Sequence, residues 1–99
     1  MKNKVTYAFK NKMWQDSASG GWYFVAIPKN LSKEIRTNFK NQEEGWGRMK
    51  IIAIVEKIEW KTSIWFDTKS DHYLLPIKAE IRKKGRLRID HPLEVTLLI

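Results

Sequence analysis

Five side chains between residues 63 and 72 are of the types that hydrolases use. Ser63 and Ser70 could supply a nucleophile, His72 a base and Asp67 or Asp71 an orienting acid. They are close only in sequence, and no Gly-x-Ser-x-Gly elbow is present. Ser63, next to Thr62, is also typical of a sheet residue, and Asp67, Ser70 and Asp71 are typical of an exposed loop. We therefore predict no catalytic residues, and keep a small hydrolase only as a third hypothesis.

Metal and phosphate motifs are also missing from the sequence. The chain has no cysteine, and its two histidines, His72 and His91, lack the close spacing of a ligand pair. Neither Gly20-Gly21 nor Gly45 and Gly47 are followed by the Lys-Ser/Thr and helix of a phosphate-binding loop, so tight turns are the simpler interpretation. The sequence predicts no metal site and no cofactor.

The five tryptophans are the most distinctive residues of the chain. Trp22 and Trp60 fall within strong strand patterns and are interpreted as packing residues. The others lie beside loops or opposite the expected core face, where they could stack on a ligand. The leading hypothesis is a non-enzymatic domain that binds a protein or small-molecule ligand. Its expected site is a barrel mouth or face framed by four residues: Trp14, Gly21, Trp46 and Trp65.

Positive charge gives the second hypothesis, which is nucleic-acid binding. The chain has 19 Lys and Arg against 11 Asp and Glu, a formal net charge of +8 that would attract polyanions. A dense basic strip could hold phosphates, although such a strip is also typical of a solvated helix face whose cations lie near the helix C-terminus. The candidate residues are Lys78, Arg82, Lys83, Arg86 and Arg88.

Alternating apolar and polar residues predict the strands that must position these side chains. Val5, Tyr7 and Phe9 begin the first alternation, and residues 22–27 form an aromatic, β-branched run expected to be covered on both faces. Further strands are expected at 49–55, 59–67 and 72–75 and near the C-terminus from Leu87 to Leu97, with residues 56–58 forming a hairpin turn.

Two short helices complete the expected fold. Leu31, Ile35 and Phe39 form one apolar stripe at four-residue spacing, with Asn30 or Ser32 as the cap. A second helix is expected from Pro76 to Gly85, where Gly85 would adopt the left-handed closing conformation. The fold class predicted is mainly β, a small six-stranded, partly open β-barrel with two short helices.

Length and composition favour one domain that spans residues 1–99. Hydrophobic residues make up 42% of the 99 residues, enough for a core of one small domain. The apolar runs are much shorter than the roughly 20 residues needed to cross a bilayer, and no signal-peptide pattern follows the N-terminus. With no cysteine to protect, a cytoplasmic location is expected and no membrane partner.

Several segments together resemble a known family. Residues 20–29, 45–47, 60–63 and 73–78 are similar, in order and spacing, to the bacterial domain-of-unknown-function family numbered 1905. The chain differs from its pattern at Glu56-Lys57, where relatives carry Gly-Gly, and at residues 90–92, where relatives carry Gly-Asp. The resemblance implies a small β-barrel, sometimes fused to a bacteriocin-protection-type domain, and implies no reaction or ligand.

Overall fold

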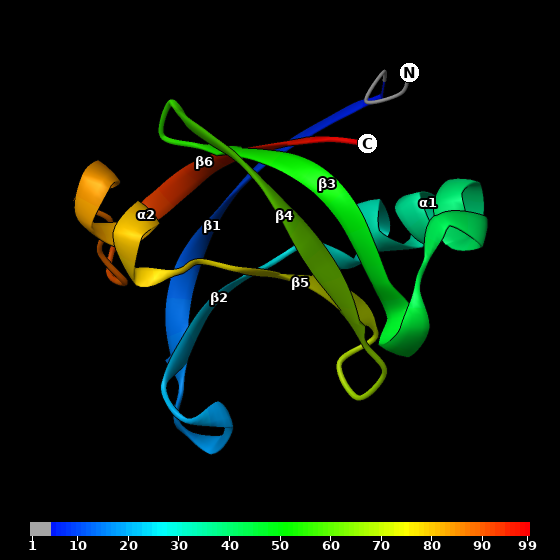
Figure 1. Cartoon of the computed structure of the whole chain (residues 1–99), viewed down its shortest axis with the longest axis horizontal. Helices are drawn as coiled ribbons and strands as arrows, with labels where there is room; N and C mark the ends of the chain where they lie inside the picture. The colour runs from blue at the N-terminus through cyan, green and yellow to red at the C-terminus, as the bar shows by residue number, and fades with distance from the viewer. Residues whose placement is uncertain (1–4) are drawn as a thin grey trace.

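Six antiparallel strands form a closed barrel (Figure 1). The computed structural model describes residues 5–99, except the side chains of residues 19 and 46. The strands follow one another around the barrel in the order β1-β2-β5-β4-β3-β6. Their bounds are β1 Thr6–Asp16, β2 Trp22–Ala26, β3 Arg48–Val55, β4 Ile58–Asp67, β5 His72–Pro76 and β6 Pro92–Leu98.

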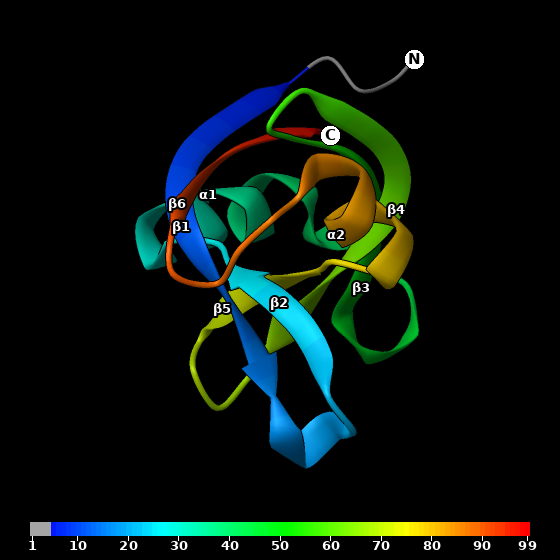
Figure 2. The ribbon, with the colours of Figure 1, turned by 90° about the vertical axis from the view of Figure 1, so that its left-hand side faces the viewer.

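Two helices cover the two open ends of this barrel. Helix α1 spans Lys29–Phe39 and helix α2 spans Ala79–Gly85. Figure 2 looks toward the end that α2 covers, with α1 behind it at the opposite end. Ile35 of α1 and Ile81 of α2 are both buried against the core. The predicted mainly β fold, with a six-stranded barrel and two short helices, is confirmed, but the barrel is closed and not partly open.

The barrel interior is filled by every second residue of the strands. In β3, Met49, Ile51, Ala53 and Val55 are all buried and alternate with more exposed neighbours. The cross-strand register repeats the pattern, because Ala53 lies between Leu97 of β6 and Trp60 of β4. One continuous core therefore holds the whole sheet in its closed form.

Ser32 has a different role from the predicted helix cap. Helix α1 begins at Lys29 after Pro28, so neither Asn30 nor Ser32 is its cap, and Ser32 lies inside the first turns, fully buried. Its hydroxyl donates to the Ile27 carbonyl at 3.0 Å and accepts from the Tyr73 amide at 3.0 Å. The residue thus joins α1 to β5 and to the segment that follows β2, a role that local capping rules cannot reveal.

The second helix is shorter than expected and ends differently. Pro76 closes β5, and α2 begins only at Ala79. The left-handed residue is Arg86, with φ of 51°, and not Gly85. A Cβ on Gly85 would lie 2.6 Å from Ile58 Cδ1, so close packing on β4 accounts for this glycine. The final strand begins at Pro92, which leaves Ile89 52% exposed outside any strand.

A polar cluster attaches α1 and the loop after it to the barrel. The Tyr73 hydroxyl donates to the carboxylate of Glu43, whose Oε2 lies 3.6 Å from Arg36 Nε. The Arg36 guanidinium in turn lies 3.8 Å from the centre of the Phe66 ring. Burial, followed by the contact with Glu43, raises the pKa of Tyr73 well above its ordinary value of 10.0. The phenol therefore stays protonated as the donor.

Candidate binding groove

Four aromatic rings form a cluster on the outside of the barrel. Strand alternation turns Phe24 outward, opposite Val25, yet only 3% of its surface is exposed. The rings of Trp14, Trp22 and Trp65 cover it at centroid distances of 5.7, 6.2 and 5.7 Å. We call these four residues the aromatic cluster. Trp22 remains 50% exposed and Trp14 37% exposed, so two residues of the cluster stay in contact with solvent.

A groove of about 1300 Å³ begins at this cluster. Strand β4 pairs with β5 at Trp65, Phe66 and Asp67, and beyond that point the two strands diverge toward α2 (Figure 1). Trp22 and Trp65, whose ring centroids are 5.2 Å apart, both line the groove. Among the described residues, its lining contains no Asp or Glu but five basic side chains: Arg48, Lys50, Lys61, Lys78 and Arg82. We call it the cationic groove.

The β3–β4 hairpin supplies three of the five cations. Its register opposes Arg48 to Trp65, Lys50 to Ser63 and Ile52 to Lys61, and the six side chains share the outer face of the hairpin. Lys50 has a carboxylate partner, Glu44, at 3.9 Å, but both groups are well exposed and such a pair is weak. This wall therefore remains positively charged.

Arg82 is fixed in the opposite wall. Its Nη1 donates to the Ile77 carbonyl at 2.8 Å, and its guanidinium lies 3.8 Å from the centre of the Tyr23 ring. A carbonyl and a ring orient the cation without neutralising it. Lys78, which precedes the first turn of α2, is exposed beside it. Both walls of the groove that Trp22 and Trp65 line therefore carry positive charge.

Only some of the predicted binding residues line the cationic groove. Gly21, Trp65, Lys78 and Arg82 line the cationic groove. Trp14 belongs to the aromatic cluster but not to the lining. The side chain of Trp46 lies outside the described residues.

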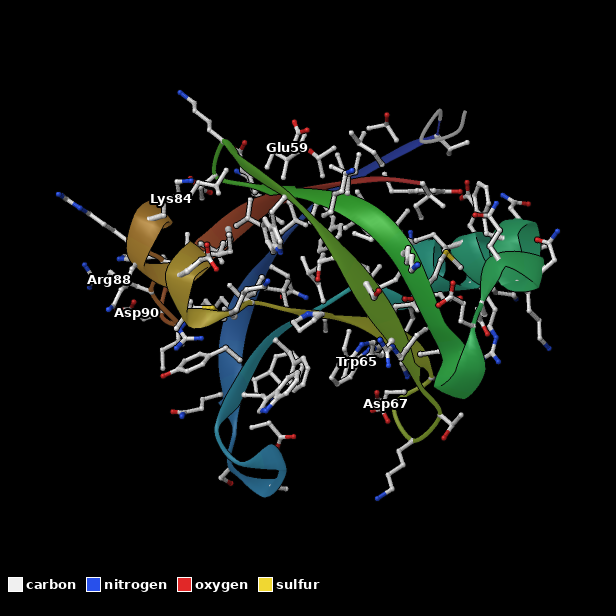
Figure 3. The ribbon with its side chains drawn as sticks, viewed as in Figure 1. Glu59, Trp65, Asp67, Lys84, Arg88 and Asp90 are labelled. Carbon is white, nitrogen blue, oxygen red and sulfur yellow. The ribbon has the colours of Figure 1, made fainter. Side chains whose placement is uncertain are left out.

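The rest of the expected basic strip lies elsewhere. Lys83 and Arg86 are exposed outside the lining, and Arg88 lies 3.3 Å from Asp90. Figure 3 shows Arg88 and Lys84 at the α2 end, well away from Trp65. Because α2 has only seven residues and Arg82 folds onto Tyr23, the strip is divided between the groove and the surface around α2 outside it.

Sequence reasoning missed part of the groove and misjudged one residue. The interpretation of Trp22 as a packing residue is only half right, because its ring packs on Phe24 and Trp65 while half of the residue is exposed. Arg48, Lys50 and Lys61 are absent from the basic residues named from the sequence. Strand alternation could have indicated them, because each falls at an outward position of the β3–β4 hairpin.

The hydrolase candidates do not form a nucleophile–base pair. The Ser70 hydroxyl donates to Asp67 Oδ2, whereas His72 Nδ1 lies 3.2 Å from the Tyr73 carbonyl oxygen. The Ser70 hydrogen bond is the main reason that the pKa of Asp67 is lowered. Ser63 lies in the groove lining instead. Within residues 5–99, no three His, Asp or Glu side chains are grouped as metal ligands, and no helix is long and apolar enough to cross a membrane.

Comparison with known proteins identifies one family. Residues 9–97 match the model of the family described as Domain of unknown function (DUF1905). Searches of curated proteins and of solved structures find no match to the chain. The groove must therefore be interpreted from its own chemistry.

Proposed function

The chain belongs to the Domain of unknown function (DUF1905) family, and we propose from its geometry that it is a non-enzymatic domain that binds an anionic ligand in the cationic groove. The supporting observation is the lining itself, which combines five basic side chains with the partly exposed Trp22 and Trp65 and, among the described residues, contains no Asp or Glu. Like charges around a concave, partly apolar surface reinforce one another and concentrate anions.

The size of the groove favours an extended ligand. Small-molecule sites usually enclose about 300–1000 Å³, and this groove of about 1300 Å³ is larger and open to solvent. Its charge comes from two walls, with Lys61 on β4 and Lys78 before α2. A ligand with several negative charges along its length would contact both walls at once.

The test is isothermal titration with inorganic polyphosphate, a polyanion without rings, at low salt. The variant Lys61→Glu/Lys78→Glu removes one cation from each wall. We expect its affinity to fall at least about tenfold, because two phosphate contacts are lost and two repulsive charges are added. Both positions are exposed, so the fold should persist.

A second double variant controls for total charge. Lys69→Glu/Lys84→Glu reverses two exposed lysines outside the groove lining, and both double variants have a formal net charge of +4 instead of +8. The control should retain wild-type affinity within about twofold. Equal losses in the two variants would show that only net charge matters, and would contradict a site in the groove.

A further inference from the structure

We infer that the ligand of the cationic groove is single-stranded nucleic acid, with a base stacked on Trp22. This inference rests on the proposed function and names the ligand class for the same site. A nucleic-acid strand combines a negative charge at each phosphate with a planar ring at each sugar. The groove offers the matching pair of features, namely basic side chains and an exposed indole.

Trp22 is already held in position for stacking. Its ring is packed on Phe24 at 6.2 Å with 27° between the planes, and on Trp65 at 5.2 Å. Half of the side chain is nevertheless exposed. A ring that is fixed before binding loses little conformational freedom when a base stacks on it. Stacking also tolerates any base, because every base has a π-face.

Charge lies where a strand bound at Trp22 would carry its phosphates. Trp65, which touches Trp22, is opposed by Arg48 across the hairpin, and Ser63 and Lys61 follow it along the same face of β4. Lys78, just before α2, lines the same groove. A strand laid along β4 would therefore meet cations on both sides of the stacked base.

Two chemical arguments favour a single strand over other polyanions. Bases in a duplex are stacked on one another and cannot reach an indole face, whereas unpaired bases can. An acidic peptide would satisfy the cations but would leave the exposed face of Trp22 without a matching planar group. The rings and charges together therefore select unpaired nucleic acid.

The experiment compares a labelled oligothymidylate with an abasic oligomer of equal length, which has the same phosphates but no bases. Fluorescence anisotropy at low salt measures both affinities. We expect the wild-type chain to bind oligothymidylate at least about tenfold more tightly, the increment that one stacked base supplies. Trp22→Leu should reduce oligothymidylate binding to the abasic level, and Trp22→Phe should restore part of it.

Trp14→Leu is the matched control. Trp14 is also a partly exposed tryptophan packed on Phe24, but it lies outside the groove lining. Its replacement should leave the preference for bases intact. Circular dichroism and thermal unfolding would confirm that each variant is folded before its affinity is compared.

The possible outcomes separate the two proposals. Equal binding of both oligomers, unchanged by Trp22→Leu, would overturn base stacking and leave the polyanion site standing. Failure of both oligomers and of polyphosphate to bind would overturn both proposals. Binding a DNA duplex or polyglutamate as tightly as oligothymidylate would also contradict the assignment of single-stranded nucleic acid.

Discussion

The hydroxyl of Ser32 connects α1 to β5 and to the segment that follows β2. Ser32 is fully buried, donates to the Ile27 carbonyl and accepts from the Tyr73 amide. Removing it would leave the Tyr73 amide without this buried acceptor. Ser32→Ala is therefore expected to lower the free energy of unfolding by about 1–3 kcal/mol, measured by urea denaturation. Lys33→Ala, at the exposed neighbouring position, should change stability little, and a similar value for both variants would contradict the role of Ser32.

Asp67, the last residue of β4, makes a contribution to stability that depends on pH. The pKa of Asp67 is lowered chiefly because Ser70 donates to its carboxylate. A carboxyl with a lowered folded pKa adds stability above its unfolded pKa, about 3.9, and this contribution is lost as pH falls through the folded pKa. Ser70→Ala should raise the pKa of Asp67 toward its ordinary value in an NMR titration. An unchanged Asp67 pKa in this variant would show that another group holds it down.

At the scale of elements, the β3–β4 hairpin has an unusual turn. Glu56 and Lys57 have φ of 48° and 78°, a conformation that glycine or asparagine normally supplies. Lys57→Gly should relieve this strain and raise the free energy of unfolding by about 1 kcal/mol. Glu56 is left in place because its carboxylate accepts from the Glu94 amide at 2.8 Å. Lys69→Gly, in a loop residue without positive φ, should give no gain, and a loss of stability in Lys57→Gly would contradict this account.

Most of the strands could be predicted from the periodicity of apolar residues. Strong alternation, as in residues 49–55, indicates the strands, because one face of each must be buried. Element ends were less predictable, since they depend on distant contacts. Gly85 packs closely on Ile58 of β4, and the Ser32 hydroxyl bonds to the Tyr73 amide of β5. Neither partner is adjacent in sequence.

The groove belongs to the scale of the whole molecule, which explains why only part of it was predicted. Composition indicated a basic surface, and Trp65, Lys78 and Arg82 were named from the sequence. Their assembly with Trp22 and Lys61 depends on barrel closure, which brings β2, β4 and the start of α2 around one hollow. An outward aromatic residue such as Trp22 has the same sequence pattern as a buried one.

The combined positive charge of the cationic groove predicts that its affinity for oligothymidylate depends on salt. Four of the five groove cations have no ion-pair partner within 4.0 Å among the described residues, the exception being Lys50. With about 0.7 counterions released per phosphate contact, the logarithm of oligothymidylate affinity should fall with the logarithm of salt at a slope of about −3. Anisotropy at several salt concentrations measures it. Lys61→Glu/Lys78→Glu should reduce the slope to about −1 to −2, and a slope near zero in the wild-type chain would contradict phosphate contacts.

The most direct measurement of the central claim is an NMR titration of the ¹⁵N-labelled chain with oligothymidylate. The account predicts that the largest amide and indole shifts occur at Trp22, Lys61, Trp65 and Lys78, along the cationic groove. Shifts concentrated at Lys83, Arg86 and Arg88, or at the smaller basic hollow lined by Lys29, Lys33 and Arg36, would contradict it.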